Sequence, residues 1–204
     1  MSSVRDVQSP VDSVLDLVGG FDAVSAQWHE SRPSQTPDGS LAGTVTRLHL
    51  VNFSLWHCED RARRTDLSDA DVVRCKREVD RLNARRNREM ERIDEQLITL
   101  VPEVTTGERV DEQFETPGML IDRLSIMSLR LYHTARTPGL GERLQLLETQ
   151  RRDLAAVLDQ LLHDLFAGRR RLKVYRQFKI ATSAPWDCGV WQDAHEWAAG
   201  ALAE

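Results

Sequence analysis

Four long stretches of this sequence repeat their apolar residues with the period of an α-helix, and almost none of the chain alternates as a β-strand does. The stretches run from about Leu41 to Arg64, from Asp69 to Leu100, from Pro117 to Ala135 and from Leu140 to Ala167. Long helices joined by short loops bury their apolar faces by packing as an up-and-down bundle. We therefore expect an all-α fold, an antiparallel helical bundle of four long helices.

Local signals support the expected ends of these helices. Ser68 and Thr116 are residue types that cap a helix N-terminus with a side-chain oxygen, and Pro117 suits the first helical position. Gly168 suits the residue that follows a helix, because glycine readily adopts a left-handed backbone conformation. These signals place the boundaries more narrowly than periodicity alone.

We expect three segments along the chain. Residues 1–40 would hold two short helices, from Pro10 to Gly19 and from Asp22 to Glu30, followed by a loop. Residues 41–179 would form the helical bundle domain, and residues 180–204 a tail with one short C-terminal helix. We expect the tail tryptophans to pack on the bundle or on a partner, which includes the seam of a homodimer; they are Trp186, Trp191 and Trp197.

The composition limits the partners and the location. The formal net charge is −5 over 204 residues, so we do not expect general affinity for nucleic acid. No apolar run approaches the roughly 20 residues that span a bilayer, so we expect no membrane partner. The first residues lack the apolar core of a signal peptide, which predicts a cytoplasmic location. Three widely spaced cysteines form neither a disulfide framework nor a CxxC zinc motif; they are Cys58, Cys75 and Cys188.

Several polar residues fall on the apolar faces of the expected helices, or at the edges of these faces, when successive residues are placed about 100° apart. They are Asn52, Glu59 and Arg63 in the first helix, Arg86 and Asn87 in the second, Asp122, Ser125 and His133 in the third, and Arg151 in the fourth. A buried polar group without a partner costs roughly 1–3 kcal/mol, and an unpaired buried charge costs far more. These groups must therefore meet one another, water or a ligand, and the simplest arrangement is a polar pocket inside the bundle.

We expect this pocket to bind an anionic small molecule, because arginine and lysine hold carboxylate and phosphate groups by charge-assisted hydrogen bonds. The ligand-binding candidates are Asn52, Arg63, Arg86, Asn87, Ser125, Arg151, Lys173, Tyr175 and Arg176. Acid–base chemistry needs side chains that exchange protons, and the catalytic candidates are Glu59, Asp122 and His133. The alternative is a set of satisfied buried salt bridges that fix the register of the helices.

The prediction needs no cofactor, but a divalent metal is an alternative. His49, His57 and Asp60 offer nitrogen and oxygen ligands, and His133 would approach from another helix. The sequence contains no HExxH motif and no Glu-x-x-His pair of the kind that di-iron bundles use. A metal-dependent enzyme with His, Asp or Glu ligands therefore remains a second reading of the polar residues.

The segment RRRLKVYRQFK (169–179) combines six basic residues and two aromatic residues with no acid. Such a segment can clamp a phosphate, grip single-stranded nucleic acid or close over the pocket. We interpret it as a partly ordered lid, because Tyr175 and Phe178 can anchor it to the body of the protein.

Four blocks of the sequence carry a family resemblance. They are NFSLWHCEDRAR (52–63), CKREVDRLNARRNREMERID (75–94), ETPGMLIDRLSIMSLRLYH (115–133) and the block QRRDLAAVLDQLLHDLFAGRRRLKVYRQFK (150–179). In this order they resemble a bacterial family called domain of unknown function 4254, over about residues 45–179. The blocks of that family carry Asn52, Glu59, Arg86, Asp122 and His133, but the family usually has Lys where Arg130 stands here.

The resemblance implies a setting and no activity. Members of the family often accompany genes for surface polysaccharides, which implies a biosynthetic context. We therefore expect a biosynthetic enzyme of the isomerase, lyase or transferase type. The competing expectation is a non-catalytic helical partner protein in a biosynthetic cluster.

Overall fold

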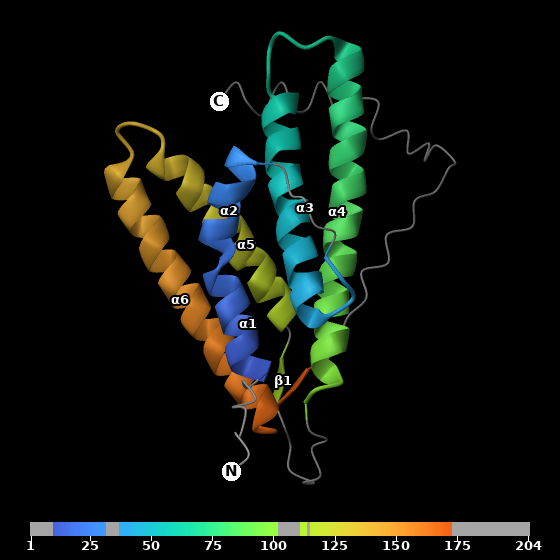
Figure 1. The fold of residues 1–204 in the computed structure, drawn as a ribbon, viewed down its shortest axis with the longest axis vertical. Coiled ribbons are helices and arrows are strands. Elements are labelled where there is room, and N and C mark those ends of the chain that lie inside the picture. The colour runs from blue at the N-terminus through green and yellow to red at the C-terminus, as the bar shows by residue number, and fades with distance from the viewer. Residues whose placement is uncertain (1–9, 32–36, 102–110, 114, 173–204) are drawn as a thin grey trace, which may run out of the picture.

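The computed structural model describes residues 10–31, 37–101, 111–113 and 115–172, and within them the fold is all-α (Figure 1). Two strands of three residues are also present there, β1 (Asp111–Gln113) and β2 (Arg170–Leu172). The six helices of this part are α1 (Pro10–Gly19), α2 (Phe21–Glu30), α3 (Leu41–Ala62), α4 (Asp69–Ile98), α5 (Pro117–Ala135) and α6 (Gly141–Phe166). All four long helices end within about two residues of their predicted bounds, and the predicted fold class is confirmed.

Capping residues occupy the ends of the long helices, and of these Ser68, Thr116 and Gly168 are predicted from the sequence. The side chains of Ser40, Ser68 and Thr116 each accept a hydrogen bond from the backbone N–H three residues further on, at the starts of α3, α4 and α5. Gly168 follows α6 with a φ of 71°, a left-handed conformation that side chains with a Cβ rarely adopt. Local chemistry therefore sets where these helices begin and end.

Helix α5 is the centre of the arrangement (Figure 1). It packs against α2, α3, α4 and α6, while α3 with α4 and α5 with α6 form two helical hairpins. The sequence explains this position, because α5 is apolar nearly all round and such a helix is stable only when most of its surface is covered. The short helix α1 packs against both α3 and α6.

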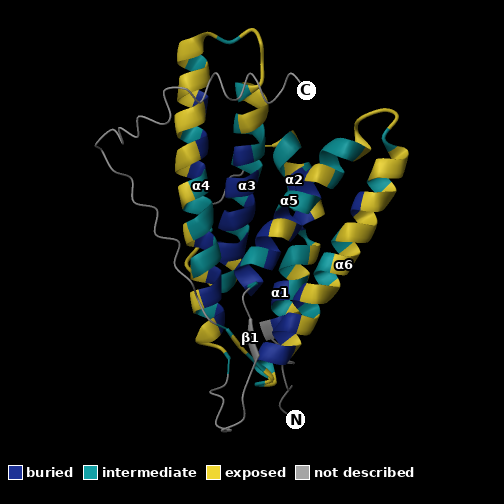
Figure 2. Cartoon of the chain, turned by 180° about the vertical axis from the view of Figure 1, so that it is seen from behind, coloured by how far each residue is buried: buried dark blue, intermediate teal, exposed yellow. Residues whose placement is uncertain are grey.

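The N-terminal helices belong to the main core. Val11, Val14 and Phe21 are buried in one cluster with leucine, isoleucine and valine side chains of the four long helices. A second and smaller cluster lies between α3 and α4 and consists of Val51, Leu55, Val79 and Leu82. Figure 2 shows the buried faces turned towards these interiors, with the tip of the α3–α4 hairpin largely exposed.

Strands β1 and β2 pair in parallel, with Asp111 opposite Arg170. The sequence does not predict this pair, because three residues are too few for a recognisable alternation. None of the helices in the described ranges is long and apolar enough to cross a membrane. The expected tail (180–204) and residues 173–179 of the basic segment, which include Lys173, Tyr175 and Arg176, lie outside the described residues.

Candidate functional site

A series of polar side chains linked by hydrogen bonds, which we call the polar chain, runs through the interior from α4 to α6. It begins at Arg86 of α4, which donates from Nε and Nη2 to the two carboxylate oxygens of Asp122 in α5, at 2.7 and 2.5 Å. Asn52 of α3 donates from Nδ2 to Asp122 Oδ1 at 2.9 Å and to Ser125 Oγ at 3.0 Å. Asp122, whose side chain is only 4% exposed, therefore joins three helices.

His49 continues the polar chain from α3 to α2. Its Nδ1 lies 2.8 Å from Ser125 Oγ, and its Nε2 lies 3.0 Å from Ser25 Oγ. The Asn52 amide nitrogen can only donate to Ser125 Oγ, which leaves the Ser125 hydroxyl hydrogen free to be donated to His49 Nδ1. Burial lowers the pKa of His49 to about 4, so the imidazole is neutral at pH 7. Both of its nitrogens are occupied by serines.

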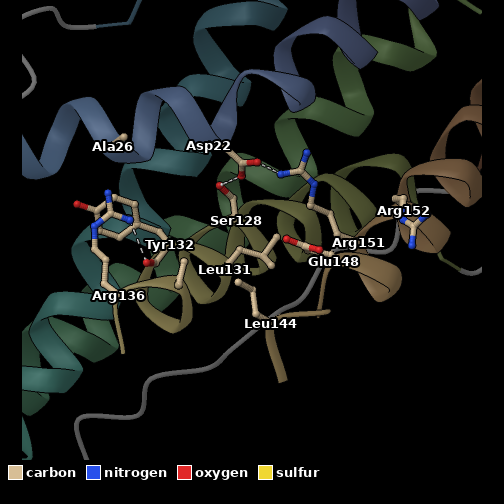
Figure 3. A pocket seen from close by; sticks show the side chains of 11 residues that line it. Asp22, Ala26, Ser128, Leu131, Tyr132, Arg136, Leu144, Glu148, Arg151 and Arg152 are labelled. Atoms are coloured by element: carbon tan, nitrogen blue, oxygen red, sulfur yellow. Dashed lines mark hydrogen bonds and ion pairs between the residues drawn. The ribbon is translucent and has the colours of Figure 1, made fainter. Parts of the chain in front are cut away.

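The polar chain ends at a second ion pair, on the other side of α5. Ser25 Oγ lies 3.4 Å from Ser128 Oγ, and Ser128 donates to Asp22 Oδ1 at 2.6 Å. Asp22 pairs in turn with Arg151 of α6 (Figure 3). This pair lines a cavity of about 530 Å³ between α2, α5 and α6. Contrary to expectation, Arg151 therefore does not share a cavity with Arg63 and Arg86, because the leucine stripe of α6 faces α5 from the opposite side.

A smaller cavity of about 320 Å³ lies between α3, α4 and α5. Its lining combines charged, amide, aromatic and aliphatic side chains: Asn52, Leu55, Trp56, Glu59, Asp60, Arg63, Asn83, Arg86, Ile126, Leu129 and Arg130. It gathers Asn52, Glu59, Arg63 and Arg86 of the predicted site, whereas Asn87 is half-buried on α4 and is not part of the lining.

Two buried polar atoms of this lining have no hydrogen-bond partner among the described residues. They are Oδ1 of Asn52 and Nε1 of Trp56. The amide of Asn52 cannot be turned round to relieve the first, because its Nδ2 must face the acceptor-only carboxylate of Asp122. An unpaired buried group costs roughly 1–3 kcal/mol, so each of these atoms favours an added hydrogen-bond partner.

Glu59 and Arg63 lie at the open edge of this cavity. Their side chains are 47% and 67% exposed, and Arg63 pairs with Glu59 at 3.0 Å and with Asp60 at 2.8 Å. The helical wheel predicts a core-facing direction for both residues, and the prediction that they are buried is wrong. The reason is visible in Figure 1, where the α3–α4 hairpin extends past the ends of the other helices.

Three histidines from three helices meet beside the cavity. His29 in α2, His57 in α3 and His133 in α5 each place one ring nitrogen within 4.8 Å of the other two. The Nε2 atoms of His29 and His57 are 3.1 Å apart. The ring of Trp56 stacks on His133 with 4.9 Å between centroids, and because Trp56 also lines the cavity, this histidine cluster and the cavity share a wall.

Burial and mutual repulsion lower the pKa of two of the three histidines, His57 and His133. Burial, and then the neighbouring His29, lower the pKa of His57. Burial and the charges of His29 and His57 lower the pKa of His133, and the carboxylate of Asp60 opposes both shifts. Imidazoles whose pKa lies below the usual value expose a nitrogen lone pair at pH 7, which is the form that binds a metal ion.

The structure changes the set of residues that could hold a metal. His57 and His133 approach one another as predicted, but His49 is held by two serines and Asp60 pairs with Arg63. His29 was missed, because no spacing in the sequence connects a residue of a short N-terminal helix to His57. The one signal that the sequence offers for His29 is that it lies within the expected helix from Asp22 to Glu30, whose apolar residues predict packing against the bundle.

The fold and the cavity first define a class, an all-α protein in which polar side chains of several helices converge beside the apolar cores. Residues 42–174, more than half of the chain, match the model of a family described as protein of unknown function (DUF4254), and the chain belongs to that family. No curated protein and no solved structure matches it. The match begins after α2, so His29, Ser25 and Asp22 lie outside the matched residues.

Proposed function

We propose that this protein binds a small anionic molecule in the cavity between α3, α4 and α5, and that it acts on this molecule as a cytoplasmic biosynthetic enzyme. The observation that carries the proposal is the pair of unpaired buried atoms in the lining, Asn52 Oδ1 and Trp56 Nε1. A ligand in the cavity satisfies both and removes the cost of leaving them unpaired.

The two atoms also describe the ligand. Trp56 Nε1 carries a hydrogen and seeks an acceptor, whereas Asn52 Oδ1 seeks a donor. A ligand that suits both has an oxygen acceptor and a hydroxyl or amino group. Sugar phosphates, sugar acids and hydroxy acids have these groups, and nucleotide sugars present them on their sugar portion.

The charges of the lining favour an anion. Arg130 is exposed at the cavity and has no ion-pair partner among the described residues, so its guanidinium is available for a carboxylate or phosphate. Arg86 is engaged with Asp122 and Arg63 with Glu59 and Asp60. We therefore assign the first contact with the anion to Arg130. Arg63 can also reach the anion once it releases Glu59 and Asp60.

Acid–base chemistry in this cavity falls to Glu59. Of the three catalytic candidates, Glu59 is the one in the lining. Both oxygens of Asp122 are held by Arg86, and one also accepts from Asn52, so we assign Asp122 to positioning these two residues. His133 lies behind the ring of Trp56.

A thermal-shift screen with sugar phosphates, sugar acids, hydroxy acids and nucleotide sugars tests the binding. Saturation at about 100 times the Kd stabilises a protein by about 2.7 kcal/mol, which raises the Tm of a chain of this length by several degrees. Arg130→Met should remove most of the shift, because a charge-assisted hydrogen bond contributes about 1.5–3 kcal/mol. Arg143→Met is the matched control, since Arg143 is an exposed arginine of α6 outside this cavity.

Two results would count against the proposal. One is a screen without any shift while the protein co-purifies with another chain, which favours the partner-protein reading. The other is a compound that stabilises wild type and Arg130→Met equally. For a compound that does bind, NMR of the mixture should show turnover that Glu59→Gln loses while the thermal shift remains.

A further inference from the structure

We propose that His29, His57 and His133 together bind one divalent transition-metal ion of the Zn²⁺ type, with a coordination position left open beside the cavity. This metal site is independent of the anion proposal, since none of its three ligands lines the cavity. It joins α2, a helix outside the family match, to α3 and α5.

The spacing of the nitrogens fits a common ion. Two histidine nitrogens bound at about 2.0–2.1 Å in tetrahedral geometry lie roughly 3.4 Å apart. The Nε2 atoms of His29 and His57 are 3.1 Å apart, and a nitrogen of His133 lies within 4.8 Å of both. Small side-chain rotations therefore suffice to bring three nitrogens around one ion.

His29 already has the tautomer of a metal ligand. Its Nδ1 lies 2.7 Å from the backbone oxygen of Ser25, which can only accept, so Nδ1 carries the ring hydrogen. The lone pair of His29 is thereby on Nε2, the atom that faces His57. Histidine ligands of metals almost always donate their other N–H to a carbonyl or carboxylate in this way, which fixes the ring orientation.

His133 supplies a second and independent observation. Its Nε2 is buried and has no hydrogen-bond partner in the described part of the chain. Its ring is held in place by stacking on Trp56, with 6° between the ring planes. A buried nitrogen that is rigidly placed and unpaired beside two other imidazoles is explained by an ion that all three share.

The ligand set selects the class of ion. Imidazole nitrogens suit Zn²⁺, Cu²⁺, Ni²⁺ and Fe²⁺, whereas Ca²⁺ and Mg²⁺ prefer oxygen ligands. Three protein ligands leave a fourth position for water or substrate, as in catalytic zinc sites. The charge of Asp60 reaches both His57 and His133, which further favours a cation among them.

Metal titration of the full, untagged chain after treatment with a chelator tests the site without any organic ligand. We expect one Zn²⁺ or Co²⁺ per chain and a Co²⁺ ligand-field spectrum typical of nitrogen ligands without sulfur. His29→Gln and His133→Gln should each weaken binding at least about 10-fold, because even the loss of a partner behind a ligand costs about 10–100-fold. His163→Gln is the control: His163 is exposed on α6, and its side chain pairs with Asp159 of the same helix, away from the histidine cluster.

Equal affinity in wild type, His29→Gln and His133→Gln would overturn the proposal, as would wild-type protein that binds no ion. Should a variant misfold by circular dichroism, X-ray absorption of the wild-type Zn²⁺ complex decides, because a shell with fewer than three imidazoles contradicts the site. Both measurements are made without the anion, so the metal site and the anion cavity can fail separately.

Discussion

At the scale of single residues, Asp122 holds the polar interior together. Its carboxylate accepts from Arg86 of α4 and Asn52 of α3 while it is almost fully buried in α5. Burial of a carboxylate is tolerated only when its charge is paired and its oxygens are hydrogen-bonded. The pair of Arg151 with Asp22 differs in this respect, because the Asp22 side chain is 47% exposed and depends less on its partner.

We predict that Arg86→Met destabilises the protein, and that it does not leave the fold unaffected. Removing one partner of a buried ion pair costs about 3–5 kcal/mol, and we expect the lower end because the Arg86 side chain is 28% exposed. Urea denaturation measures the change. Arg81→Met, which removes an exposed pair with Glu78 on the same helix, should change the free energy of unfolding by less than about 1 kcal/mol. Equal stability of Arg86→Met and wild type would show that Asp122 does not depend on Arg86.

Asp94 predicts a dependence of stability on pH. Burial raises the pKa of this carboxyl from 3.8 to about 6 in the folded protein. Between these values the folded state keeps a proton that the unfolded state has lost, so the free energy of unfolding falls as the pH rises from about 4 to about 6. Asp94→Asn lacks this group, so its stability relative to wild type should improve by about 2–3 kcal/mol between pH 4 and pH 7. Urea denaturation at both pH values checks this, and a constant difference would contradict it.

At the scale of elements, α4 and α5 cross closely at Gly118. A Cβ at this position would lie 2.5 Å from the backbone oxygen of Met90 and 3.0 Å from the carboxylate of Asp94. Asp94 also accepts the Gly118 backbone N–H at 2.7 Å. The absence of a side chain therefore lets the start of α5 sit on α4.

Gly118→Ala should push these helices apart and cost about 1–3 kcal/mol of stability, because the clash is with backbone that cannot rotate away. Gly141→Ala is the control at the start of α6, where a Cβ meets nothing within 4 Å and stability should hold or rise slightly. Thermal unfolding of the two variants gives the comparison. If both alanines are tolerated equally, the close crossing is not a constraint.

The helices could be predicted because their signals are local. Ser68, Thr116 and Pro117 act within a few residues of their own position, and the apolar period needs no knowledge of the partner helix. The β1–β2 pair could not be predicted, because its two strands are far apart in the sequence and each has only three residues. Local chemistry decides helices, and long-range contact decides this small sheet.

At the scale of the whole molecule, α2 connects the N-terminal helices to the site. Phe21 is buried and stacks on His49 with 4.3 Å between ring centroids, while Ser25 bonds to the same histidine. The same helix carries His29 into the histidine cluster. Helix α2 therefore contributes residues to the core, to the polar chain and to the proposed metal site.

Phe21→Ala should destabilise the protein by about 3–5 kcal/mol, as large-to-small core substitutions of phenylalanine do. It should also raise hydrogen exchange in α2 more than in α4, because α2 loses its main buried anchor. Val157→Ala on the exposed face of α6, where Val157 is 50% exposed, should change neither quantity noticeably. Uniform exchange across the helices in Phe21→Ala would show that α2 has no separate attachment.

For the site, the sequence predicted only which way some side chains point from their helices. A helical wheel correctly turned Asn52, Arg86 and Asp122 towards one another, because direction depends on the sequence of one helix. It failed for Glu59, since a wheel carries no information on where the covering helices end. It failed for Arg151, because Arg151 lies on the side of α5 away from the cavity that Arg86 lines. The sequence gives no prediction for His29, because only tertiary packing brings α2 next to α3.

The most direct measurement is a high-resolution crystal structure of the protein with the anionic compound that gives the largest thermal shift. We expect that compound between α3, α4 and α5, accepting from Trp56 Nε1, donating to Asn52 Oδ1 and placing its anionic group at Arg130. A compound bound only between α2, α5 and α6, beside Asp22 and Arg151, would contradict the proposal.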